Sequence, residues 1–167
     1  TDAKDSAGNA LASAYTHSTG FTTSSTPDTT APTVFSSSPA DATTSVSVSS
    51  TIAVTFSEAM DTTTVTTNTS NTTCSGTLQV SSDSFSSCVQ MSASPSLSNS
   101  NKTFTVTPSS SLSLKATYKI RVTAGVTDSA GNVLSSQWTT SSGFTTAKLF
   151  IVFLAQSSKI SASSDGI

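Results

Sequence analysis

Two cysteines are the residues of this sequence whose type and number most plainly suit chemistry. Cys74 and Cys88 are the only cysteines, so they form either one disulfide or two free thiols. In an exported chain an even pair of cysteines is usually oxidised, and we therefore expect the bridge. It would close a loop of about fifteen residues and stabilise the fold by roughly 3 kcal/mol in the chain-entropy model.

A small set of acids forms the second group of candidate residues. Carboxylate oxygens are hard ligands that suit Ca²⁺, and the candidates are Asp28, Glu58, Asp61 and Asp128. The sequence Asp-Ser-Ala-Gly-Asn that begins at Asp128 lacks the distal Glu of an EF-hand. A turn in which Gly131 takes a positive φ explains that sequence equally well. We expect no obligatory cofactor, and calcium at a domain junction is the one ion to test.

The sequence offers no arrangement that suits nucleophilic catalysis. Its single histidine, His17, lies outside the segment that we expect to fold as a complete domain, so a Ser-His-acid triad has no base there. No Cys-x-x-Cys pair is present that would suit zinc. We therefore expect that the chain is not an enzyme.

The elements that must position these residues are predicted to be strands. Charged residues make up 10% of the chain, against about 25% in typical soluble domains, and Ser and Thr take their place. The basic residues are scattered, so we expect no nucleic-acid partner. Short runs that alternate apolar and polar residues predict an all-β fold. The expected strands are 33–35, 45–48, 51–56, 78–80, 88–91, 103–107, 117–123 and one near 143–146.

Alternation within these runs predicts the core of an Ig-like antiparallel β-sandwich with Greek-key connections. The side chains expected to point inward are Ile52, Val54, Phe56, Phe104, Val106, Tyr118, Ile120, Val122 and Phe144. Tyr118 is also expected to form a tyrosine corner, in which its hydroxyl bonds to the backbone upstream. Its alternative is an ordinary buried strand tyrosine.

An internal repeat sets the expected domain boundaries. Residues 5–23 match residues 128–146 at about two-thirds of the positions, as tandem copies of one domain would. We therefore interpret residues 1–26 as the C-terminal tail of a preceding Ig-like repeat and residues 27–32, with two prolines, as an inter-domain linker. Residues 33–146 form the complete domain. Residues 147–167 start a following region or are a disordered tail.

The C-terminal region contains an apolar run at residues 149–154. Six residues are too few to cross a bilayer, which takes about twenty, so we expect no membrane span. The run is either a buried strand or the beginning of a following domain.

Several segments together resemble a known family, the bacterial Ig-like domains of the S-layer type, the fifth class of the Big group. The segments that carry the resemblance are Asp28–Val34, Ser38–Thr43, Ile52–Asp61, Phe104–Pro108, Tyr118–Val122, Asp128–Asn132 and Phe144–Thr146. The resemblance implies tandem extracellular modules of bacterial surface proteins and implies no catalytic residues. Residues 62–101, rich in Ser, Thr and Asn, depart from the simplest family pattern, and we expect there a solvated loop or long hairpin.

The resemblance implies an extracellular location at the bacterial surface, in a secreted parent or one anchored to the outer membrane. The expected function is that of a structural spacer and possible adhesive module in a surface protein. Its partners would be neighbouring repeats in the same chain and a host matrix protein or glycan bound through the 62–101 region. The alternative is an accessory spacer of a secreted carbohydrate-active enzyme.

Overall fold

A computed structural model describes residues 3–23 and 26–148 of the chain. The described residues contain eight β-strands and no helix, so none of their segments is a helix that could cross a membrane. The strands are β1 (Val34–Ser38), β2 (Ile52–Phe56), β3 (Leu78–Ser81), β4 (Ser96–Ser98), β5 (Thr103–Val106), β6 (Thr117–Val122), β7 (Trp138–Thr139) and β8 (Phe144–Thr145).

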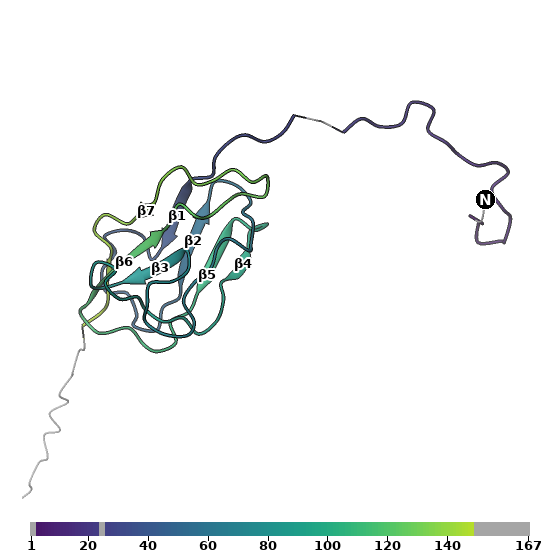
Figure 1. Cartoon of the computed structure of the whole chain (residues 1–167). Helices are drawn as coiled ribbons and strands as arrows, with labels where there is room; N and C mark the ends of the chain where they lie inside the picture. Colours follow the sequence, from purple (N-terminus) through teal and green to yellow (C-terminus); the bar gives the residue numbers. More distant parts are fainter. Residues whose placement is uncertain (1–2, 24–25, 149–167) are drawn as a thin grey trace, which may run out of the picture.

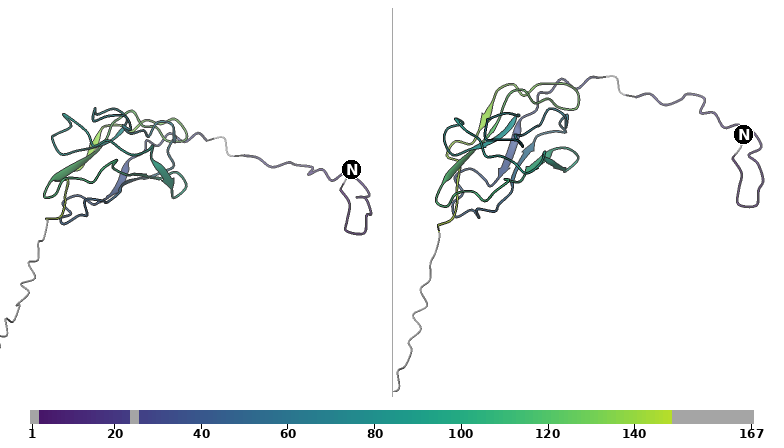
Figure 2. Two further views of the ribbon diagram at one scale, coloured as in Figure 1. Left: turned by 90° about the horizontal axis from the view of Figure 1, so that it is seen from below. Right: turned by 60° about the horizontal axis from the view of Figure 1, so that its bottom comes forward.

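The strands form two sheets that pack face to face (Figure 1 and Figure 2). One sheet has the order β1-β2-β5-β4, and the other has the order β3-β6-β7, with β8 also paired to β6. Every strand pair is antiparallel. This order is that of an Ig sandwich of the constant type, so the predicted all-β sandwich with Greek-key connections is confirmed.

The core lies between the two sheets and is built by the predicted alternation. Ile52 and Val54 of β2 are fully buried, and so are Ile120 and Val122 of β6. The remaining residues predicted to point inward are also buried: Phe56, Phe104, Val106, Tyr118 and Phe144. Between the sheets the rings of Phe56 and Phe104 meet edge to face, with centroids 5.8 Å apart.

Two predicted strands are wrong as strands. Residues 45–48 contribute only a single parallel bridge, from Val46 to Thr146, because Ser45 just before it takes a left-handed φ of 59° that interrupts extended backbone. Residues 88–91 form one bridge, from Met91 to Pro108. Their backbone groups hydrogen-bond to several different segments and not to one neighbouring strand. The sequence analysis also missed β4 and β7, which are too short to show alternation.

The start of β6 has the geometry of a tyrosine corner. The backbone N–H of Ser113 donates to the hydroxyl of Tyr118 at 3.0 Å, five residues upstream of the ring. The ring of Tyr118 stacks on Phe144 of β8, with centroids 5.7 Å apart. Tyr118 thus joins the β5–β6 connection to the last strand of the domain.

The polypeptide enters the sandwich at one end and leaves it at the opposite end (Figure 1). Pro32 of the entering segment is buried, and the next residue, Thr33, exchanges backbone and side-chain hydrogen bonds with Ser57 after β2. Residues 3–23 are exposed throughout. The apolar run expected at 149–154 lies outside the described residues.

Candidate metal centre

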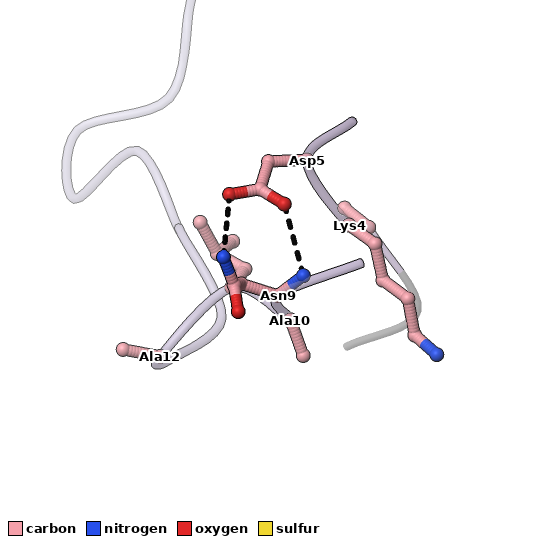
Figure 3. Close-up of a pocket in the computed structure, with 7 residues that line it drawn as sticks. Lys4, Asp5, Asn9, Ala10 and Ala12 are labelled. Carbon is pink, nitrogen blue, oxygen red and sulfur yellow. Dashed lines mark hydrogen bonds between the residues drawn. The ribbon is translucent and has the colours of Figure 1, made fainter. Parts of the chain in front are cut away.

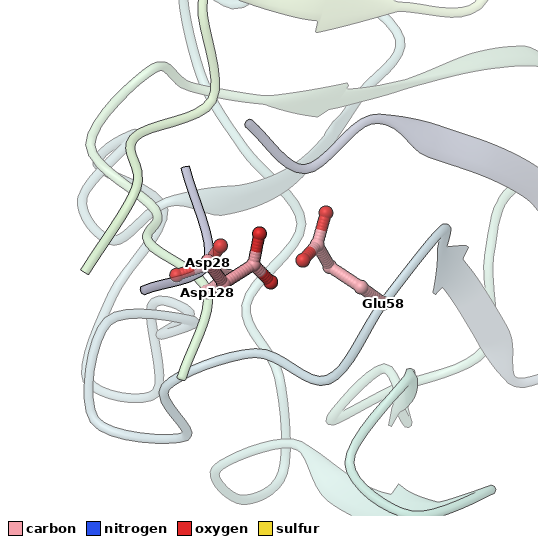
Figure 4. Close-up of side chains that lie close together, drawn as sticks. All are labelled: Asp28, Glu58 and Asp128. Carbon is pink, nitrogen blue, oxygen red and sulfur yellow. The ribbon is translucent and has the colours of Figure 1, made fainter. Parts of the chain in front are cut away.

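Three acids meet at the end of the sandwich where the chain enters (Figure 4). Asp28 lies in the segment that precedes β1, Glu58 follows the end of β2, and Asp128 begins the turn after β6. One carboxylate oxygen from each lies within 4.8 Å of the other two. Three of the four acids that the sequence analysis singled out therefore share one site.

The turn from Asp128 to Asn132 fixes the position of the Asp128 carboxylate. Asp128 is only 1% exposed, and its Oδ1 accepts the backbone N–H groups of Ala130 and Asn132, each at 2.8 Å. Its Oδ2 accepts the side-chain amide of Asn132, also at 2.8 Å. Gly131 lies at a φ of 95°, which glycine adopts without strain.

Asn132 links this turn to the entering segment. Its Nδ2 also donates to the backbone carbonyl of Asp28 at 3.1 Å, 104 residues away in sequence. The carboxylate of Asp28 accepts the backbone N–H of Thr30 at 2.9 Å. The sequence analysis did not single out Asn132, although its recurrence as Asn9 in the first copy was a signal for it.

Asp61, the fourth candidate, does not belong to the cluster. Its Oδ1 accepts the backbone N–H of Thr63 at 2.9 Å and the hydroxyl of Thr63 at 2.7 Å. These bonds hold the pKa of Asp61 below its usual value. Asp61 instead has a local structural role at the start of the connection that follows β2.

The three clustered acids differ in their electrostatics. Burial and the nearby charges of Asp28 and Asp128 raise the pKa of Glu58 above its ordinary value. Burial also acts to raise the pKa of Asp128, but the hydrogen bonds from Asn132, Ala130 and Gly131 outweigh it and hold that pKa below the ordinary value. Near neutral pH the site therefore concentrates negative charge, and its oxygens are of the kind that Ca²⁺ prefers.

The cysteine loop contributes no residue to this cluster. Cys74 and Cys88 are joined in a disulfide with an S–S distance of 2.06 Å. Asp83, inside the loop, accepts bonds from the hydroxyls of Ser81 and Ser87 and from the backbone N–H of Ser87. These bonds lower the pKa of Asp83 to about 2. The loop is thus folded on itself.

This loop covers the outer face of the β3-β6 sheet, within the region expected to be a solvated loop or long hairpin. All four residues of β3 are buried. The guanidinium of Arg121 on β6 donates to Oε1 of Gln79 on β3 and lies 3.9 Å from the centroid of the Phe85 ring. The sequence analysis missed this contact because Arg121 and Phe85 are far apart in the chain.

Comparisons with solved structures find limited similarity to a surface protein. The structure of surface layer protein SbsC, domains 1–6, has a TM-score of 0.48 and 22% identity over 71% of this chain and 14% of that chain. The N-terminal part of the bacterial S-layer protein SbsC has a TM-score of 0.47 and 23% identity over 71% of this chain and 24% of that chain. This chain thus spans a quarter or less of those proteins. No curated protein matches it.

A family model provides the firmer comparison. The model described as a bacterial Ig-like domain matches residues 28–146, which include the whole sandwich and the three clustered acids. Both the strand order and the tyrosine corner fit that description. This chain therefore belongs to the bacterial Ig-like domain family.

Proposed function

We propose that this chain is a structural module of an extracellular bacterial protein and that it spaces neighbouring domains along the chain. The observation that carries the proposal is the family match over residues 28–146. The path of the chain supports it, because a domain that is entered at one end and left at the other separates its neighbours by its own length (Figure 1).

The repeat extends this proposal to the first residues. Residues 1–26 are the C-terminal tail of a preceding Ig-like repeat, and residues 27–32, with Pro27 and Pro32, are the linker between the two. Prolines favour extended backbone and make such a linker semi-rigid. The preceding repeat and the present domain are then successive units of one surface protein.

A divalent cation, with Ca²⁺ as the first choice, is proposed to stiffen this junction. Asp28 belongs to the linker, whereas Glu58 and Asp128 belong to the sandwich. A cation bound by all three would therefore hold the linker against the domain and fix the angle at which the preceding repeat approaches. Without it, repulsion between the carboxylates would favour release of the Asp28 segment.

The cation proposal is tested by thermal unfolding of the full chain with excess Ca²⁺ and with EDTA. Wild type is expected to melt at a higher temperature in Ca²⁺, and Glu58→Gln is expected to lose that response. Asp61→Asn is the matched control, because Asp61 is an acid outside the cluster whose carboxylate accepts hydrogen bonds from Thr63. The absence of a Ca²⁺ shift in wild type, or an equal shift in Glu58→Gln, would rule the site out.

The spacer proposal is tested by a binding screen of the oxidised full chain against matrix proteins and glycans. A spacer is expected to show no saturable binding. Saturable binding that is lost when residues 75–87 are deleted, with the sandwich still folded by circular dichroism, would instead make the module adhesive. Saturable binding to plant or microbial polysaccharide alone would favour the accessory module of a carbohydrate-active enzyme.

A further inference from the structure

The two copies of the repeated segment differ at one position that is buried in the sandwich. Residues 5–23 and 128–146 are identical at 13 of 19 positions. The six differences, given as first copy and second copy, are Ala10/Val133, Ala12/Ser135, Ala14/Gln137, Tyr15/Trp138, His17/Thr140 and Thr19/Ser142. In the second copy, Trp138 is half-buried, Thr140 is buried and the other four are exposed.

Residues 5–9 keep the Asp-to-Asn turn that residues 128–132 form in the sandwich (Figure 3). Asp5 accepts the backbone N–H groups of Ala7 and Asn9 at 2.9 Å and the side-chain amide of Asn9 at 3.0 Å, as Asp128 does with Ala130 and Asn132. The backbone φ angles of two glycines also agree between the copies. Gly8 and Gly20 have φ values of 87° and 62°, and their counterparts Gly131 and Gly143 have 95° and 78°.

The first copy exposes the side chains that the second copy buries. Leu11 is 49% exposed and Phe21 is 91% exposed, whereas their counterparts Leu134 and Phe144 are 4% and 1% exposed. Among the described residues, the first copy has no neighbour like β6 that covers these side chains. Because Leu134 and Phe144 are buried in this domain, another Ig-like domain of the same kind is the partner that would bury Leu11 and Phe21.

Thr140 forms hydrogen bonds with the backbone of β6 at a position that belongs to neither β7 nor β8. Between β7 and β8, the buried backbone N–H of Ile120 donates to Oγ1 of Thr140 at 2.9 Å, and the N–H of Thr140 donates to the carbonyl of Ile120 at 3.0 Å. Thr140 is only 4% exposed, so an imidazole at this position would overpack the site and remove the acceptor of the Ile120 N–H.

We propose that residues 5–23 are a strand-donor segment for a second Ig-like domain of this kind, and that the 17/140 position decides which domain accepts each segment. The inference rests on the proposal that the first residues are the end of a preceding Ig-like repeat. A threonine fits at position 140 of this domain and a histidine does not. The domain that accepts residues 5–23 would therefore need more room at its counterpart of Ile120. The mismatch keeps neighbouring repeats from exchanging their last strands while they fold.

The test places the first-copy sequence at residues 128–146 of the full chain. One variant carries the five differences other than that at position 140: Val133→Ala, Ser135→Ala, Gln137→Ala, Trp138→Tyr and Ser142→Thr. It is expected to fold and to melt within about 5 °C of wild type, because these side chains are exposed or half-buried. Adding Thr140→His is expected to lower the midpoint by a further ~10 °C, and Thr140→Ser, which keeps the hydroxyl, by much less.

Two results would overturn the inference. Failure of the five-change variant to fold would show that the two segments are not interchangeable. An unchanged midpoint on adding Thr140→His would show that position 140 selects nothing. Neither result bears on the spacer or cation proposals, since the binding screen and the Ca²⁺ shift of the wild-type chain involve none of these six positions.

Exchange between molecules gives an independent readout. When the full chain is unfolded and refolded at high concentration, His17→Thr is expected to yield more strand-exchanged dimer than wild type by size-exclusion chromatography with light scattering. Phe21→Ser, added to His17→Thr, removes the largest apolar anchor of the donor and should return the dimer fraction to that of wild type. Equal dimer fractions for wild type and His17→Thr would contradict the proposal.

Discussion

Glu58 lies where two other carboxylates already concentrate negative charge. Because its pKa in the folded domain is raised above the ordinary value of 4.5, its ionised form destabilises the cation-free domain. Glu58→Gln is therefore expected to raise the melting midpoint in EDTA at pH 7 by about 3 °C, the scale of one repulsion of about 1 kcal/mol. The measurement is scanning calorimetry at low ionic strength.

The same reasoning gives the pH dependence of this effect. The stabilising contribution of protonated Glu58 is complete at pH values below its unfolded pKa and is lost as the pH rises through its raised folded pKa. The advantage of Glu58→Gln in EDTA should thus disappear when the pH is lowered to about 4. An advantage that stays constant from pH 7 down to that value would show that Glu58 is not the titrating group.

Gly143 and Gly131 both have positive φ but differ in the space around them. A Cβ at Gly143 would clash with the backbone carbonyl oxygen of Tyr118, whereas a Cβ at Gly131 meets nothing within 4 Å. Gly143→Ala is expected to destabilise the domain by about 3 kcal/mol or more, and Gly131→Ala by about 1 kcal/mol. Urea unfolding measures both, and equal losses would mean that backbone strain alone matters at Gly143.

At the scale of elements, the disulfide loop closes over the outer face of β3 and β6. The double variant Cys74→Ser and Cys88→Ser is expected to lose roughly 3 kcal/mol of unfolding free energy, because the unfolded chain regains the freedom of that loop. Urea unfolding of the variant and of reduced wild type should agree. An unchanged midpoint would show that the contacts of Phe85 and Asp83 hold the loop without the bridge.

Asp83 is expected to stabilise the same loop in a way that is lost in acid. Its pKa of about 2 in the folded domain is lower than the ordinary 3.8, so its stabilising effect is present above about pH 4 and is lost as the pH falls through 2. NMR titration should find the Asp83 carboxyl midpoint near 2 and move it upward in Ser87→Ala, which removes the hydroxyl donor. A midpoint near 3.8 in wild type would contradict the loop geometry.

At the scale of the whole molecule, the sandwich is expected to fold without the first residues. Residues 3–23 are exposed, and within the described part of the entry segment the hydrogen bonds to the sandwich begin with Asp28. Deletion of residues 1–25 should therefore shift the melting midpoint of the domain by no more than about 2 °C. A drop comparable to that of the disulfide variant would mean that residues before Asp28 pack on the sandwich.

Trypsin digestion provides a second test of whether the sandwich folds independently of the first residues. Lys4 lies in the exposed first segment, whereas Arg121 is half-buried within β6. Cleavage after Lys4 should precede any cleavage after Arg121 in the native protein, because a strand must open before a protease can cut it.

Elements whose geometry depends on neighbouring residues could be predicted from the sequence. Alternation marked β2 and β6 and the faces that they bury, because in a strand the side-chain direction repeats every two residues. The Asp-x-x-Gly-Asn turn was also legible, since its hydrogen bonds join groups within four residues. The short β4 and β7 escaped because two or three residues are too few to establish a period.

The tertiary structure alone decided which distant residues meet. Asp28, Glu58 and Asp128 come together and Asp61 does not, although the sequence analysis treated all four acids as equal candidates. The contact of Arg121 with Phe85 and the fit of Thr140 against Ile120 were likewise outside the reach of the sequence. The physical reason is that strand order and register place residues that lie tens of positions apart, and these depend on the packing of the whole sandwich.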